Sequence, residues 1–255
     1  MILTRLLLAA SLFGSGAAAA RSEAELRACM AANLPQHTLA QDLILTRRGA
    51  DPDTRPMALR WYWRRRSGDS GFDAAMRLSA PADLAGAAYL FIGESHADGI
   101  YVYLPALGKV RRVNGATAAA SLFGSNLSVF DLKLLTSGLR GGRLQRLGDT
   151  VSDGHAAERW RYLPPDDPDI LYDRIDLVID DAWCLPLVAR LYGGVPWKVL
   201  TLDRATVQQN EGRWQARRAT LSDLRDGSRT LIEIRDQRID DAIPDAVFSP
   251  RRFYK

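Results

Sequence analysis

Apolar side chains recur at every second position through most of this sequence. Between residues 57 and 64 the odd positions are apolar, and the even positions include two arginines. Residues 72–78 repeat the alternation after a Ser-Gly-Asp-Ser-Gly turn at residues 67–71. A period of two places alternate side chains on opposite faces of a β-strand, so each segment has one apolar face. The chain is therefore predicted to be mainly β.

The same pattern continues to the end of the chain. We predict further strands at residues 87–92, 100–104, 109–113, 143–147, 155–162, 171–179, 184–192, 197–205, 214–221 and 230–239. Gly193-Gly194 and Asp226-Gly227 lie between neighbouring segments and are typical of hairpin turns. Strands joined by tight turns favour an antiparallel meander, and a twisted sheet of about ten strands tends to curl. We expect a curled sheet of about ten or eleven strands that approaches a barrel.

Three segments are predicted to be helical. Residues 22–33 begin with Ser22 as N-cap, Glu25 completes a capping box, and Pro35 ends the helix. Residues 128–136 repeat that spacing with Ser128 and Asp131, and residues 243–248 form a last short turn. Such helices can plug what the strands leave open, giving a mainly β (α+β) fold.

The first twenty residues have the features of a secretory signal peptide. Arg5 precedes an apolar run from Leu6 to Phe13, and small residues end the segment at Ala20. We expect cleavage after Ala20, a periplasmic location, and one monomeric domain over residues 21–255. Removing Arg5 from the 34 basic residues leaves 33 against 30 acidic ones, a net charge of +3. The basic residues form no stripe, so nucleic acid is not an expected partner.

Cys29 and Cys184 are the two cysteines of the chain. An exported protein reaches an oxidising compartment, where a disulfide between them is chemically permitted. We favour this bridge over two separate buried thiols, although spacing alone leaves both open. A bridge would contribute roughly 3–5 kcal/mol by closing so long a loop.

The sequence lacks the usual signatures of an enzyme or a metalloprotein. His37, His96 and His155 have no second ligand at metal-binding spacing, and no phosphate-binding glycine loop is present. We expect no metal and no cofactor. Residues 93–98 bring Ser95 and His96 together, but catalytic triads converge from separate elements, so a polar hairpin loop is the favoured interpretation. We predict that the protein is not an enzyme.

Large apolar and aromatic side chains concentrate on single strand faces. A barrel of this size can hold a ligand, and such side chains adapt well to alkyl chains. An ordinary packed core is the alternative, which the sequence leaves open. The candidate cavity residues are Trp61, Trp63, Met76, Leu78, Leu90, Ile92, Tyr101, Tyr103 and Leu132.

One stretch resembles a known family. It contains Tyr-Leu-Pro ending at Pro105, the Arg111-Arg112 pair, a Phe-Gly turn at Gly124, and a Phe-Asp-Leu segment around Asp131. In order and spacing it resembles the outer-membrane lipoprotein-sorting proteins LolA and LolB. The resemblance implies an unclosed antiparallel barrel with a helical lid over a hydrophobic cavity that binds lipid or lipoprotein acyl chains. It implies an inner-membrane transporter and an outer-membrane acceptor as partners, and no catalytic residues.

The resemblance also implies structural roles for these motif residues. Asn126 stands where an acidic residue is expected, which is a departure from the family pattern. Asp131 remains, and we expect it to pair with Arg111 or Arg112, since an arginine facing the barrel interior would be costly to bury alone. Two alternatives to a carrier stay open: an accessory subunit that docks to an envelope lipid or efflux transporter, and a hydrolase using Ser95 and His96.

Overall fold

A single large antiparallel sheet dominates the computed structural model, which describes residues 20–49, 55–66, 71–93, 99–113, 121–128, 130–131, 134, 139, 141–165 and 171–255. Its first six strands are β1 (Thr38–Arg48), β2 (Met57–Arg65), β3 (Phe72–Ala80), β4 (Ala88–Ile92), β5 (Gly99–Leu104) and β6 (Lys109–Val113). Its other strands are β7 (Arg143–Ser152), β8 (His155–Leu163), β9 (Arg174–Asp180), β10 (Pro186–Gly193), β11 (Val195–Leu202), β14 (Arg218–Asp223) and β15 (Arg229–Ile239).

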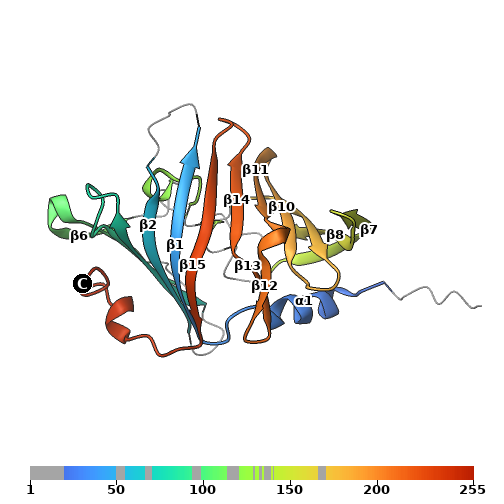
Figure 1. The fold of residues 1–255 in the computed structure, drawn as a ribbon, viewed down its shortest axis with the longest axis horizontal. Coiled ribbons are helices and arrows are strands. Elements are labelled where there is room, and N and C mark those ends of the chain that lie inside the picture. Colours follow the sequence, from blue (N-terminus) through green and yellow to red (C-terminus); the bar gives the residue numbers. More distant parts are fainter. Residues whose placement is uncertain are drawn as a thin grey trace, which may run out of the picture.

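The remaining elements are short. Helix α1 spans Glu23–Ala32, and β12 (Val207–Asn210) pairs with β13 (Arg213–Ala216) in a separate hairpin. The 3₁₀ turns in the described part of the chain are η1 (Pro105–Leu107), η3 (Leu122–Gly124), η4 (Arg204–Thr206) and η5 (Asp245–Phe248). Figure 1 shows α1 and the β12–β13 hairpin at the same end of the sheet.

The strand order is β6-β5-β4-β3-β2-β1-β15-β14-β11-β10-β9-β8-β7. The first and last strands of the chain, β1 and β15, pair at the centre, and the two halves extend outward from them. Strands β6 and β7 form the two edges of this sheet, so the sheet is not closed (Figure 1). Among the described residues between these two strands, Asn126 lies on the inner face, where its N–H donates to Thr230 of the central strand β15.

The expected count of ten or eleven strands is wrong, because the sheet contains thirteen. The alternation missed β1, whose inner face carries a polar Gln41 between Leu39 and Leu43. The segment predicted as one strand at residues 214–221 is divided between β13 and β14, which belong to different sheets. The helical lid stays a prediction.

Helix α1 begins as the sequence predicts. The Glu25 backbone N–H donates to Ser22 Oγ at 3.3 Å, and the Ser22 N–H donates to Glu25 Oε2 at 2.8 Å. This reciprocal capping box satisfies two backbone donors at the helix start. Leu26 and Met30 are the buried residues of the helix, so it packs with one apolar face against the sheet. Among the described residues, no helix is both long and apolar enough to cross a membrane.

The two faces of the sheet carry separate apolar clusters. The inner cluster runs along the whole sheet from Leu45 and Trp61 to Ile179 and Leu221. The outer cluster lies only on the first half, where the C-terminal segment covers it with Phe248 and Phe253. Turn η5 of this segment falls within the helical turn predicted at residues 243–248. The C-terminal segment therefore acts as a second layer for half of the sheet.

Candidate functional site

An apolar cavity lies between helix α1 and the inner face of the second half of the sheet. The centre of a water molecule can reach about 240 Å³ of this cavity. The atom-free space as a whole, including the open mouth, is about 1040 Å³. The lining residues are Met30, Asn33, Leu34, Asp131, Leu134, Leu139, Ile175, Leu177, Cys184, Leu185, Pro186, Ala189, Leu191, Leu200, Trp214, Gln215 and Leu221. Fourteen of these seventeen side chains are apolar or aromatic, so the cavity suits an alkyl chain better than a polar metabolite.

The register of the strands explains both the apolar floor and the empty space. Ala189 on β10 pairs with Leu177 on β9 and with Leu200 on β11, and Leu200 pairs with Leu221 on β14. Paired residues of neighbouring strands share a face of the sheet, so these side chains form one apolar row. Ala189 is the short member of that row, and it leaves unfilled space where its neighbours are leucines.

Helix α1 and the hairpin form the wall opposite that floor. Asn33, the C-cap of α1, donates from Nδ2 to the Trp183 carbonyl at 2.7 Å. Its Oδ1 accepts a hydrogen bond from the Trp214 N–H of the hairpin at 2.9 Å. Trp183 and Trp214 pack against each other with ring centroids 5.5 Å apart. One amide side chain thus joins the end of the helix to the hairpin at the edge of the cavity.

A disulfide fixes α1 over the cavity. Cys29 and Cys184 are bonded, with their Cα atoms 5.8 Å apart, as the sequence analysis favoured. Cys184 lines the cavity and is 1% exposed. The bond joins residues 155 positions apart, so it ties the N-terminal helix to the loop between β9 and β10.

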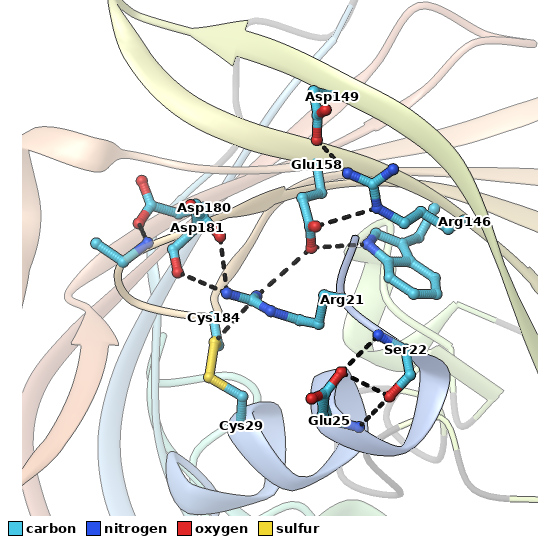
Figure 2. A network of polar contacts seen from close by, with 12 residues as sticks. Arg21, Ser22, Glu25, Cys29, Arg146, Asp149, Glu158, Asp180, Asp181 and Cys184 are labelled. Carbon is cyan, nitrogen blue, oxygen red and sulfur yellow. Dashed lines mark hydrogen bonds and ion pairs between the residues drawn. A yellow bond between two sulfur atoms is a disulfide. The ribbon is translucent and has the colours of Figure 1, made fainter. Parts of the chain in front are cut away.

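Arg21, just before α1, reinforces this attachment (Figure 2). Its guanidinium lies 2.7 Å from Asp181 Oδ1 and 3.5 Å from Glu158 Oε2, and it also donates to the Cys184 Sγ at 3.5 Å. Glu158 is buried and accepts further hydrogen bonds from Arg146 and from Trp160 Nε1. A buried carboxylate needs such partners to offset its desolvation. The start of the helix is therefore anchored by charge and its end region by a covalent bond.

A buried ion pair closes the inner end of the site. Lys198 of β11 donates from Nζ to Asp131 Oδ2 at 2.7 Å, and both residues are at most 5% exposed. Asp131 also accepts from Tyr172 Oη at 2.5 Å and from Ser128. Burial, and then the Asp131 charge, raise the pKa of the Tyr172 hydroxyl far above its usual value, so it stays a donor. This network holds the connection between β6 and β7 on the inner face.

The expected partner of Asp131 is therefore wrong. Arg111 and Arg112 are exposed on the edge strand β6, whereas the cation beside Asp131 is Lys198. Lys198 was not predicted from the sequence as a site residue, although it shares the apolar face of the predicted strand with Leu200. The capping-box spacing of Ser128 and Asp131 is confirmed: Ser128 N–H donates to Asp131 Oδ2 at 2.7 Å.

Asn126, the departure from the family pattern, has a structural role. Its Nδ2 donates to Ser228 Oγ at 2.6 Å, and its Oδ1 accepts from Thr230 Oγ1 at 2.7 Å. Its backbone carbonyl accepts a second hydrogen bond from Lys198 Nζ at 2.7 Å. A neutral amide thus pins the connection to β15 without adding a charge to the interior.

The other two motif residues shape turns. Pro105 is the first residue of η1, a position at which the backbone N–H that proline lacks is not needed as a donor. Gly124 ends η3 with φ of +76°, a left-handed conformation that favours glycine.

None of the eight described candidate cavity residues lines this cavity, and they do not share one face. Four belong to the inner cluster of the first half of the sheet: Trp61, Trp63, Met76 and Leu78. The other four belong to the outer cluster: Leu90, Ile92, Tyr101 and Tyr103. The register explains the separation, because Met76 pairs with Tyr89 and Ala75 pairs with Leu90. Their role in ligand binding stays a prediction.

Three predicted features lie wholly or largely outside the described residues. They are Leu132, the cluster of Ser95 and His96, and the signal peptide apart from Ala20. Within the described ranges, no group of three histidine, cysteine or acidic side chains is arranged to hold a metal ion.

The open sheet with its central β1–β15 pair has the fold of the LolA superfamily. A domain from Vibrio parahaemolyticus assigned to outer membrane lipoprotein sorting is 21% identical, with a TM-score of 0.79, over 90% of this chain and 96% of that one. A DUF1329 family protein from Desulfovibrio piger is 23% identical, with a TM-score of 0.80, over 88% and 95%. A LolA superfamily protein from Nitrosomonas europaea is 16% identical, with a TM-score of 0.70, over 90% and 98%. The family fold expected from the resemblance is confirmed as an open antiparallel sheet, whereas its barrel shape and its helical lid stay predictions.

The sequence itself places the chain in a family. A family model described as "Uncharacterized protein" matches residues 72–255, which is more than half of the chain, so the chain belongs to that family. A comparison with curated proteins finds no match.

Proposed function

We propose that this protein is a periplasmic carrier that binds lipid or lipoprotein acyl chains in the cavity under α1 and transfers them toward the outer membrane. The apolar cavity carries the proposal, because helix α1 covers it and its floor is a continuous row of aliphatic side chains. The similarity in fold to a lipoprotein-sorting domain supports it. No chemical step is involved, so the proposed protein is not an enzyme.

The physical need for such a carrier is large. Each methylene group removed from water gains about 0.8 kcal/mol, so a free acyl chain crosses an aqueous space poorly. A cavity that accepts the chain must also release it. Binding must therefore be weaker than complete burial, and an incompletely filled cavity provides that difference.

The wider setting belongs to the same proposal. A signal peptide over residues 1–20 would export the chain, and residues 21–255 would form one monomeric domain. An inner-membrane transporter would supply the cargo and an outer-membrane acceptor would receive it. Lipid extracted from protein purified without added detergent, and identified by mass spectrometry, would name the cargo.

A cavity-filling variant tests the proposal directly. Ala189→Phe adds a ring to the floor of the cavity, and binding of a pyrene-labelled acyl chain should fall at least tenfold. Thr201→Phe is the matched control, because Thr201 is exposed on the neighbouring strand β11 and pairs with Val188 rather than with Ala189. Equal binding by both variants, or no binding by the parent protein, would contradict the proposal.

A further inference from the structure

Three glutamines form a hydrogen-bonded row that ends at the cavity. Gln41 of β1 donates from Nε2 to Gln237 Oε1 at 2.5 Å, and Gln237 of β15 donates from Nε2 to Gln215 Oε1. Gln215 belongs to β13 and lines the cavity. All three side chains are partly buried.

The donor-to-acceptor direction of these hydrogen bonds determines which atom of the last amide is free to bind a ligand. Gln237 occupies the Gln215 oxygen, so the Gln215 Nε2 group keeps its donors. In the described part of the chain, that nitrogen has no hydrogen-bond partner. Each amide polarises the next, which strengthens a donor at the end of such a chain. The row therefore presents an N–H donor at the wall of an apolar cavity.

The other polar groups of the described lining are already occupied. Asn33 bonds to Trp183 and Trp214, and Asp131 accepts from Lys198, Tyr172 and Ser128. Asp131 is the one charged residue among the described lining residues, and it is an acid. None of the described lining residues is a cation, and the nearby Lys198 is already paired with Asp131, so a carboxylate on the ligand would be buried without a partner.

We infer that Gln215 binds an uncharged carbonyl group on the ligand, so that esters or amides of long acyl chains are preferred over free fatty acids. This inference rests on the proposed function, since it requires an alkyl chain in the cavity. The acyl chain supplies most of the affinity, and the hydrogen bond from Gln215 Nε2 to the carbonyl oxygen supplies the selectivity. One hydrogen bond of this kind corresponds to a preference of about 2- to 10-fold.

Competition experiments on the purified protein test this selectivity. A pyrene-labelled alkane is displaced by three unlabelled ligands of equal chain length: a fatty-acid methyl ester, a fatty acid and an alkane. The ester should displace the probe about 2- to 10-fold more effectively than the alkane at pH 8. The fatty acid should be the weakest of the three competitors at that pH, because its carboxylate is charged.

Two substitutions separate the hydrogen bond from the cavity. Gln215→Met keeps the length of the side chain and removes the donor, so the ester should lose its advantage while alkane binding stays within about twofold. In the Gln237→Glu variant the new carboxylate can only accept hydrogen bonds, from Gln41 and from Gln215. Gln215 must therefore turn its Nε2 toward that carboxylate and present its oxygen to the cavity. That variant should prefer a long-chain alcohol, which donates a hydrogen bond, over the ester.

The outcomes distinguish the two proposals. Alkane binding with an ester preference that survives Gln215→Met would overturn the role of Gln215 and leave the carrier intact. Preference for the fatty acid would do the same. If the parent protein binds none of the ligands, both the carrier and this inference fail. Circular dichroism and thermal unfolding confirm that each variant is folded before binding is compared.

Discussion

Removing the Cys29–Cys184 bond should strongly destabilise the protein. The loop it closes spans 155 positions. The entropy of closing a loop of that length corresponds to about 5 kcal/mol at 25 °C. The perturbation is Cys29→Ser, Cys184→Ser and the double variant, each in the chain from residue 21 to residue 255.

Urea unfolding followed by tryptophan fluorescence measures this loss. With a slope of about 3 kcal/mol per molar urea for a domain of this size, the midpoint should fall by about 1.7 M. The three variants should give nearly equal values, because either serine breaks the same bond. Reductant should lower the midpoint of the parent protein and leave the double variant unchanged. A shift below about 0.5 M, with the bond confirmed by mass spectrometry, would refute the view that it locks α1 to the sheet.

Two further results are expected. Lys198→Met should cost about 3–5 kcal/mol in the same urea titration, because it leaves the buried Asp131 carboxylate without its cation, and adding Asp131→Asn should recover part of the loss. Partial burial raises the pKa of Asp240, but hydrogen bonds from the N–H groups of His37 and Thr38 outweigh it and hold the pKa below its usual value. The contribution of Asp240 to the free energy of unfolding is complete above about pH 4 and is lost as the pH falls further. The stability of Asp240→Asn should therefore depend less on pH between about pH 5 and pH 2. Parallel plots of stability against pH for the variant and the parent protein would contradict this.

The local features of this fold could be predicted from the sequence. The capping boxes at Ser22 and Ser128 depend on residues three positions apart, and both have the predicted bonds. The strands with clean alternation, such as β2, were placed to within a residue or two. Such features are fixed by neighbours in the chain, so pattern and propensity are sufficient to find them.

The cavity could not be predicted in the same way. Its position depends on which strands face each other, and on Ala189 being short where the paired Leu177 and Leu200 are long. The candidate residues were chosen for size, which selected the aromatic first half of the sheet. There Trp63 stacks on Phe72, and Phe72 packs at a tilt against Phe91, so large side chains mark the packed part of the interior. Empty space is instead marked by a small residue among aliphatic ones.

The cavity weakens the packing of the second half of the sheet, so other interactions must hold its walls together. Lining atoms that face open space lose packing contacts, which lowers stability relative to a filled core. The disulfide contributes about 5 kcal/mol, and it is attached at Cys184 in the cavity lining itself. A bound alkyl chain would replace the missing contacts, so the protein should become more stable when its cavity is filled. The gain in stability on adding ligand should also persist in the Cys29→Ser, Cys184→Ser variant, provided that α1 still covers the floor.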